Sequence, residues 1–167
     1  MFNKDVLNFH VEKFDLGAFN LNFGGVDGGK IDPSLGVGLR RSDTKEPIAI
    51  VSDSYEPVQY LALVENLEQS ISMSGIDLDG ADFETNLIGN GEQLELTAKF
   101  NAEATTIDGR NDVVIPQFKF RTSHNRTWAN NGMMGYFRSA CYNTLVDGNK
   151  LAYVYGRHSK NFSVSSF

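Results

Sequence analysis

The chain has few of the residues that build covalent or metal-based scaffolds. It contains one cysteine and three histidines, so an internal disulfide is excluded and a closed zinc site is not expected. No run approaches the roughly 18 apolar residues that a membrane helix needs. The first residues lack a basic stretch followed by an apolar run, so we expect no secretory signal. These absences predict a cytoplasmic protein without a metal or nucleotide cofactor.

Charge of the two signs is unevenly distributed along the chain, whose formal net charge is −6. Residues 1–109 hold 7 lysines and arginines against 19 acids, which gives −12, and residues 110–167 hold 8 against 2, which gives +6. Such asymmetry is typical of an acidic solvated region joined to a basic functional surface. Alternatively, the halves neutralise each other within one fold or across an oligomer interface.

The first half of the chain predicts a hairpin followed by a helix. Residues 36–41 and 47–52 have the composition of strands joined by a short polar loop. Apolar residues then recur at three- and four-residue steps and predict a helix over about 57–73, with Pro57 as its first residue and Gly75 after its end. We expect Glu65, Glu68 and Gln69 on its outer face.

The second half predicts mostly strands. Apolar and polar residues alternate between 81 and 100 around Gly89-Asn90-Gly91, and Asn-Gly between alternating runs is a strong hairpin signal. Residues 113–121 predict a further strand, in which Pro116 favours an edge or a bulge. Phe118 and Phe120 share one face of that strand, and Lys119 and Arg121 share the other. Residues 151–155 predict a short strand, and 134–146 fit a strand or a helix.

These elements predict an α+β fold in which one main helix packs on a mostly antiparallel sheet. Their order is similar to the core of the ring-forming proteins that anneal single strands in recombination, which is a likeness of fold alone. We expect residues 35–167 to form a single α+β domain. Residues 1–34 predict a flexible N-terminal arm that docks by its phenylalanines. The glycines near residues 24–29 do not predict a phosphate loop, because no Gly-Lys-Ser/Thr follows.

Cations, amides and the only tryptophan of the chain gather between residues 119 and 138. Cationic side chains neutralise phosphates, and aromatic rings stack on bases. This composition predicts a nucleic-acid-binding surface formed by Lys119, Arg121, His124, Arg126, Trp128 and Arg138. The prediction assumes that the cations gather on one exposed patch. The alternative is an ordinary solvated sheet face with the tryptophan in the core.

A thiol site is a separate possibility. Cys141 with His124 or His158, oriented by Asn143, has the residue types of a Cys–His nucleophile. A buried free cysteine explains the same residues without catalysis.

Four segments resemble the phage/plasmid-like family known as domain of unknown function 932. They are residues 39–44 (LRRSDT), 50–59 (IVSDSYEPVQ), 123–125 (SHN) and 137–145 (FRSACYNTL). His158 falls where the family places a late arginine-histidine, so the resemblance covers about residues 35–160. Asn125-Arg126 replaces the family's aspartate-glycine and adds a positive charge. The resemblance implies a mobile-element origin, a host-cell cytoplasmic location and often longer relatives, but no established activity.

We therefore predict a DNA-metabolism protein that binds single-stranded DNA or RNA, as a homo-oligomeric annealing or recombination factor. Binding is favoured over enzymatic activity. The alternative is an acidic interaction protein that inhibits a host defence protein by imitating DNA phosphates. Its working surface would consist of Asp77, Asp79, Asp82, Glu84, Glu92 and Glu95. A third hypothesis is a hydrolase that uses Cys141.

Overall fold

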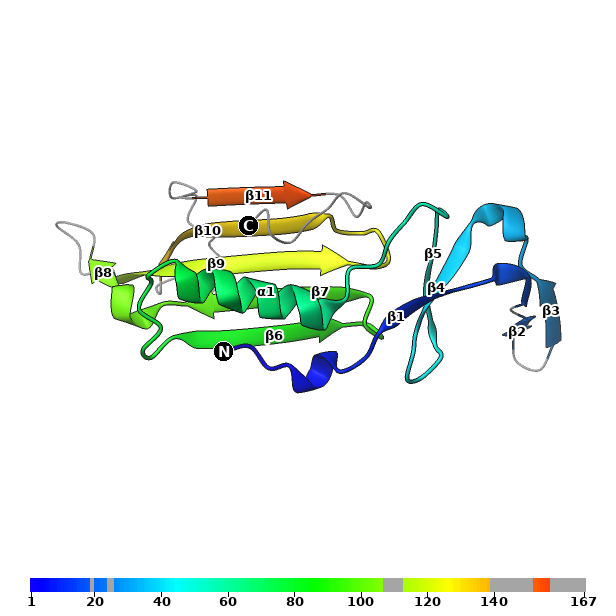
Figure 1. The fold of residues 1–167 in the computed structure, drawn as a ribbon, viewed down its shortest axis with the longest axis horizontal. Coiled ribbons are helices and arrows are strands. Elements are labelled where there is room, and N and C mark those ends of the chain that lie inside the picture. Colours follow the sequence, from blue (N-terminus) through cyan, green and yellow to red (C-terminus); the bar gives the residue numbers. More distant parts are fainter. Residues whose placement is uncertain (19, 24–25, 107–112, 139–151, 157–167) are drawn as a thin grey trace.

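The computed structural model of the chain describes residues 1–18, 20–23, 26–106, 113–138 and 152–156. Figure 1 shows an elongated molecule, with a large sheet and the helix at one end and smaller sheets at the other. The helix and strands are β1 (Val11–Phe14), β2 (Asn20–Phe23), β3 (Val26–Lys30), β4 (Val37–Arg41), β5 (Pro47–Val51), α1 (Tyr60–Met73), β6 (Asp82–Ile88), β7 (Gln93–Lys99), β8 (Thr105–Thr106), β9 (Val113–Ser123), β10 (Asn130–Arg138) and β11 (Ala152–Gly156). Short 3₁₀ turns occur at Asp5–Leu7, Leu16–Ala18, Pro33–Leu35 and Asn101–Glu103.

The described strands form antiparallel sheets. The large sheet has the order β11-β10-β9-β7-β6, and β8 pairs with β9. The small sheet has the order β1-β4-β5, and β2 pairs with β3. Helix α1 lies across one face of the large sheet (Figure 1). The α+β class predicted from the sequence is therefore confirmed.

Both predicted hairpins are present, but Pro116 occupies an unexpected place. It lies in β9, which is a central strand between β7 and β10. Its carbonyl accepts a hydrogen bond of 3.0 Å from the N–H of Phe100, one residue beyond the end of β7. The N–H and C=O of a residue in an antiparallel strand point toward the same neighbouring strand. The N–H that Pro116 lacks would therefore point toward the end of β7, where the regular ladder stops. The predicted edge position was wrong, because β9 is a central strand. A proline is tolerated here because the ladder with β7 ends beside it and resumes with β8 in a different register.

Helix α1 begins later than predicted. Gln59 at its N-cap is extended, with φ −69° and ψ 126°. The Gln59 amide accepts from the N–H of Val11 at 2.9 Å and donates to its carbonyl at 3.0 Å. These two hydrogen bonds to β1 hold the preceding segment in extended form, so Pro57 is not the first helical residue. Gly75, with φ +76°, follows the helix as predicted.

The first residues of the chain contribute to the same core as the helix. Phe2, Leu7, Phe9 and Val11 are buried in one cluster with α1 and the large sheet. Glu68, which we expected on the outer face of the helix, is buried. Its carboxylate accepts from the N–H of Phe2 at 2.7 Å, because the N-terminal segment crosses that face. The division of the chain at residue 34 stays a prediction.

The loop between β4 and β5 contains an ion pair whose contribution to stability depends on pH. Arg41 donates to both carboxylate oxygens of Asp43, at 2.9 and 2.7 Å, and this pair lowers the pKa of Asp43 to about 2. A lowered pKa stabilises the fold above the unfolded-state value of about 3.9, and the gain is lost as pH falls through about 2. We therefore expect Asp43→Asn to lower the urea midpoint at neutral pH.

The difference between Asp43→Asn and the unmodified chain should shrink as pH falls from about 4 to about 2. Urea unfolding followed by circular dichroism at several pH values measures it. A difference that is constant across this range would contradict the ion pair.

None of the helices in the described part of the chain has the length and apolar character needed to cross a membrane.

Candidate nucleic-acid interface

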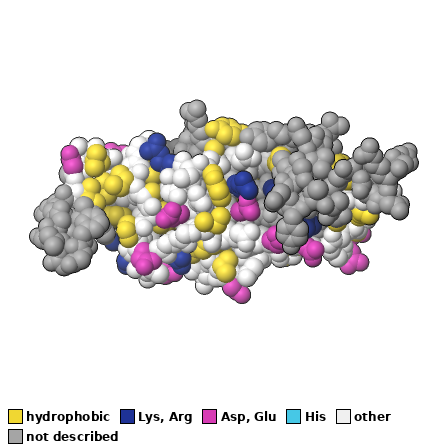
Figure 2. All heavy atoms as spheres, turned by 180° about the vertical axis from the view of Figure 1, so that it is seen from behind, with side chains coloured by type: hydrophobic (Ala, Val, Ile, Leu, Met, Phe, Trp, Pro, Cys, Tyr) yellow, Lys and Arg dark blue, Asp and Glu magenta, His cyan; other side chains and the backbone are white. Residues whose placement is uncertain are grey.

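The two faces of β9 differ as the sequence predicted. Phe120 is fully buried beside Leu96, and Phe118 lines a space against α1. Lys119 and Arg121 alternate with these residues and therefore lie on the opposite face. We call that side of the large sheet, opposite α1, the rear face. Figure 2 shows the molecule from this side.

The rear face carries charges of both signs. Arg121 Nε lies 2.5 Å from Glu95 Oε2, in register across β9 and β7. On the next rungs, Lys99 Nζ lies 2.5 Å from Glu84 Oε1. Acidic and basic side chains stand next to one another on this side in Figure 2. The uniformly cationic patch that we assumed is therefore not present around Arg121, because a carboxylate of the same chain pairs with it.

Trp128 lies beside Arg121. It is neither fully exposed as a stacking surface nor fully buried in the core, the two positions considered from the sequence. The Arg121 guanidinium carbon lies 5.3 Å from the centre of the Trp128 ring. Trp128 is half-buried, whereas the Arg121 side chain is 52% exposed. Asn131 pairs with Arg121 in register and also pairs with Tyr155, which is 58% exposed. One rung of the rear face thus carries a guanidinium, an amide and an aromatic ring.

His124 is not on an exposed surface. Its side chain is fully buried. The imidazole stacks on Tyr60 with ring centres 4.4 Å apart, and its Nδ1 lies 3.3 Å from the Tyr55 hydroxyl oxygen. A ring in this place is not available to stack on a base. The placement differs from our expectation because two tyrosines from the helix region, which the local sequence around His124 does not reveal, enclose it.

The remaining predicted cations are spread out. Arg126 is exposed at the turn between β9 and β10, with φ +66°, and pairs with no carboxylate among the described residues. The backbone of Arg138 pairs with Val114, seven residues along β10 from Asn131. At about 3.3 Å per residue this separation is about 23 Å. The side chain of Arg138 lies outside the described part, and β10 does not bring its backbone near Arg121.

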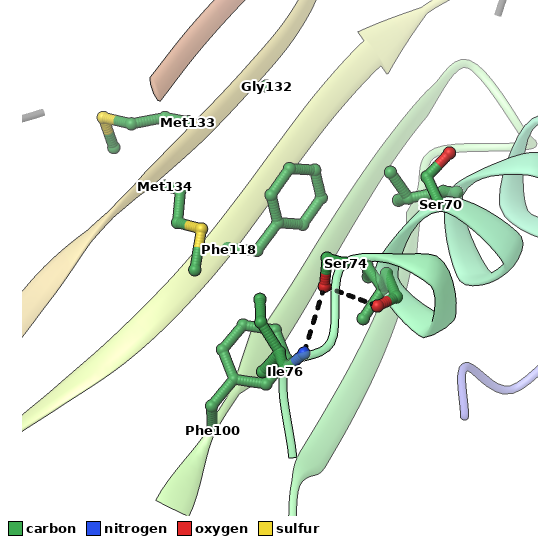
Figure 3. A pocket seen from close by; sticks show the side chains of 10 residues that line it. Ser70, Ser74, Ile76, Phe100, Phe118, Gly132, Met133 and Met134 are labelled. Carbon is green, nitrogen blue, oxygen red and sulfur yellow. Dashed lines mark hydrogen bonds between the residues drawn. The ribbon is translucent and has the colours of Figure 1, made fainter. Parts of the chain in front are cut away.

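A second feature is an apolar pocket of about 350 Å³ on the helix side of the sheet (Figure 3). It is lined by Leu67, Ser70, Ile71, Ser74, Ile76, Phe100, Phe118, Gly132, Met133 and Met134. None of these residues is charged, and the Ser70 and Ser74 hydroxyls donate to helix carbonyls. The pocket suits an apolar group and offers nothing that would hold a phosphate. Sequence reasoning missed it because its walls come from α1, β9 and β10.

The described residues give little support to the thiol site, a metal site or the acidic DNA-like surface. Cys141, Asn143 and His158 lie outside them, so the thiol hypothesis stays a prediction. In the described part no group of three metal-ligating side chains occurs. The acids proposed as a DNA-like surface are divided, because Asp82 and Glu92 lie at opposite ends of the β6–β7 hairpin.

Comparison with protein families gives one result for this chain. Residues 47–165 match the family described as Domain of unknown function (DUF932). The comparisons with curated proteins and with solved structures gave no match. The matched residues include β5, the loop before α1, the helix, the large sheet and the turn that carries His124. The chain therefore belongs to the family of domain of unknown function 932, the family that its sequence segments resembled.

Proposed function

We propose that the protein binds single-stranded nucleic acid on the rear face of its large sheet, around Arg121 and Trp128. One observation supports this most strongly: the guanidinium of Arg121 lies over the ring of Trp128 on a sheet face where Arg121 is 52% exposed. A guanidinium within cation–π distance of an aromatic ring combines a positive charge with a π-face. Bases stack on such surfaces without regard to sequence.

The neighbouring residues fit the same ligand. Tyr155 is exposed two strands away in the same rung and offers a second aromatic ring. Asn131 lies between them in register, and asparagine side chains are among those that contact phosphates and bases in nucleic-acid complexes. Duplex DNA hides the faces of its bases, so a surface of this kind favours single strands.

The acidic neighbours limit the electrostatic part of binding. Glu95 already pairs with Arg121. The backbone of Arg138 lies far along β10, so at most three of the predicted cations, Lys119, Arg121 and Arg126, contribute to phosphate contacts near Trp128. For single strands, each neutralised phosphate contributes about −0.7 to the slope of log K against the logarithm of the salt concentration. We therefore expect a salt slope no steeper than about −2, and stacking supplies most of the affinity.

Substitution of Arg121 or Trp128 should weaken binding strongly. We expect Trp128→Ala to raise the dissociation constant for a labelled single-stranded oligonucleotide by about 5- to 150-fold, the equivalent of one lost base stack. Arg121→Glu should weaken binding at least about tenfold, because it removes the guanidinium and adds a second carboxylate beside Glu95. Fluorescence anisotropy at low salt measures both.

Two further variants make the test specific. Glu95→Gln should strengthen binding about two- to fivefold, because it removes the carboxylate that competes with phosphate for Arg121. Lys45→Glu changes the net charge as much as Arg121→Glu, but in the β4–β5 loop, where Lys45 is 56% exposed. It should leave the affinity nearly unchanged. Equal losses in Lys45→Glu and Arg121→Glu would show a general charge effect and refute a site on the rear face.

An annealing factor would hold its strand on many copies of this surface at once. Native mass measurement with and without oligonucleotide tests this part of the proposal. A ring-sized assembly supports an oligomeric annealing factor, and a monomer that carries one oligonucleotide supports simple strand binding.

A further inference from the structure

The turn that carries Arg126 and Trp128 is closed by short hydrogen bonds at its base. The Ser123 hydroxyl accepts from the N–H of Trp128 at 2.8 Å and donates to its carbonyl at 2.9 Å. Asn125 Oδ1 accepts from the hydroxyl of Thr127 at 2.6 Å. Residues 124–128, which we call the turn loop, therefore keep their shape as one unit. His124 is one of the residues that tie this unit to the rest of the chain, together with Thr127, whose hydroxyl accepts from Gln93 Nε2 at 2.6 Å.

His124 anchors this loop to three other parts of the chain. Its N–H donates to the carbonyl of Glu92 at 2.7 Å, and the Tyr60 hydroxyl donates to the same carbonyl at 3.1 Å. Its ring stacks on the Tyr60 ring, with an angle of 26° between the planes, and its Nδ1 faces the Tyr55 hydroxyl at 3.3 Å. The segment before α1 and the helix itself thus meet at the buried imidazole of His124, and the β6–β7 turn is held by its backbone N–H.

The surroundings of this imidazole disfavour charge. Burial raises the pKa of the Tyr60 and Tyr55 hydroxyls, which is the direction expected where charged forms are poorly solvated. Arg126 is close enough to Tyr55 to lower the pKa of that hydroxyl in part, so a second positive charge nearby would be repelled. The carboxylate of Glu92 is the acidic group on this side, and it accepts from Asn125 Nδ2 at 2.8 Å.

We propose that His124 is a positioning residue of the nucleic-acid interface, an inference that rests on the proposed function. Protonation of its imidazole releases the turn loop and weakens binding. The buried ring lies against two phenols, and burial of a charged ring without an ionic partner is costly, so protonation would drive the ring toward water. His124, which the sequence placed in contact with the ligand, thus affects binding through the positions of Arg126 and Trp128.

The test uses Trp128, the only tryptophan of the chain, as a reporter that needs no ligand. As the pH is lowered from about 8 while the chain stays folded, we expect its emission to shift with a one-proton midpoint. The affinity for a single-stranded oligonucleotide should fall with the same midpoint, by about tenfold per pH unit below it. His124→Gln, which cannot gain a proton, should remove both transitions, and His10→Gln at an exposed position should keep them.

Tyr55→Phe is the second variant, in case His124→Gln does not fold. It keeps the ring but removes the hydroxyl, and should weaken binding at pH 8 about two- to tenfold and move the midpoint. A transition that persists unchanged in both variants, or a flat emission in the folded unmodified chain, overturns the positioning role. An emission transition that depends on His124 without oligonucleotide binding at any pH supports the positioning of the loop and overturns the proposed function alone.

Discussion

Replacing Phe120 by alanine is expected to lower the free energy of unfolding by about 3–5 kcal/mol. Phe120 is fully buried in the middle of the central strand β9. Its register partners are Leu96 on β7, which is also fully buried, and Gly132 on β10. Because glycine has no side chain that could move into the space, the structure cannot collapse easily around the cavity.

Equilibrium urea unfolding, followed by circular dichroism, measures this loss as a lower midpoint at an unchanged slope. Ile88→Ala is a suitable control, because Ile88 is 43% exposed on the edge strand β6. It should cost less than about 1 kcal/mol. A cost for Phe120→Ala as small as that of Ile88→Ala would contradict the packing of β9 against α1.

Gly36→Ala is expected to destabilise the fold by about 2–5 kcal/mol for two separate reasons. The φ of Gly36 is +124°, a conformation that residues with a side chain rarely adopt. A Cβ at this position would also lie 2.1 Å from the carbonyl oxygen of Val51. Val51 pairs with Val37 at the start of β4. The small sheet must therefore shift its ladder to admit one methyl group.

Gly75→Ala separates the two causes. Gly75 also has a positive φ, +76°. A Cβ added there would have no atom within 4 Å apart from those of Gly75 and the residues on either side of it in the chain. It should cost only about 1–2 kcal/mol, the conformational part alone. Urea unfolding of both variants gives the difference, which measures the overlap with Val51. Equal costs for the two substitutions would show that the close approach of Gly36 to Val51 is wrong.

The parts of the fold that could be predicted from the sequence are those that depend on neighbouring residues. Asn-Gly between alternating runs indicated the β6–β7 hairpin, and apolar spacing indicated the helix. The errors came from contacts across long stretches of chain. Gln59 bonds to Val11 across 48 residues, and Glu68 bonds to Phe2 across 66. No local pattern contains these partners, so the start of α1 and the burial of Glu68 could not be foreseen.

The candidate site divides in the same way. Alternation along β9 placed Lys119 and Arg121 on one face. The pairing of Arg121 with Glu95 depends on the register of two strands that are 26 residues apart at this point. The burial of His124 depends on Tyr55 and Tyr60, which lie in other elements. Residue type alone therefore indicated a surface for nucleic acid, but it did not separate the residues that would touch a ligand from those that would hold the surface in place.

The most direct test of the central claim is the emission of Trp128 during titration with a single-stranded oligonucleotide at low salt. The chain has one tryptophan, so the signal comes from the proposed interface alone. Stacking of a base on this ring should quench the emission until it saturates, and added salt should reverse the quenching only modestly. Saturable binding by anisotropy with an unchanged Trp128 emission, or no binding at all, would contradict the account.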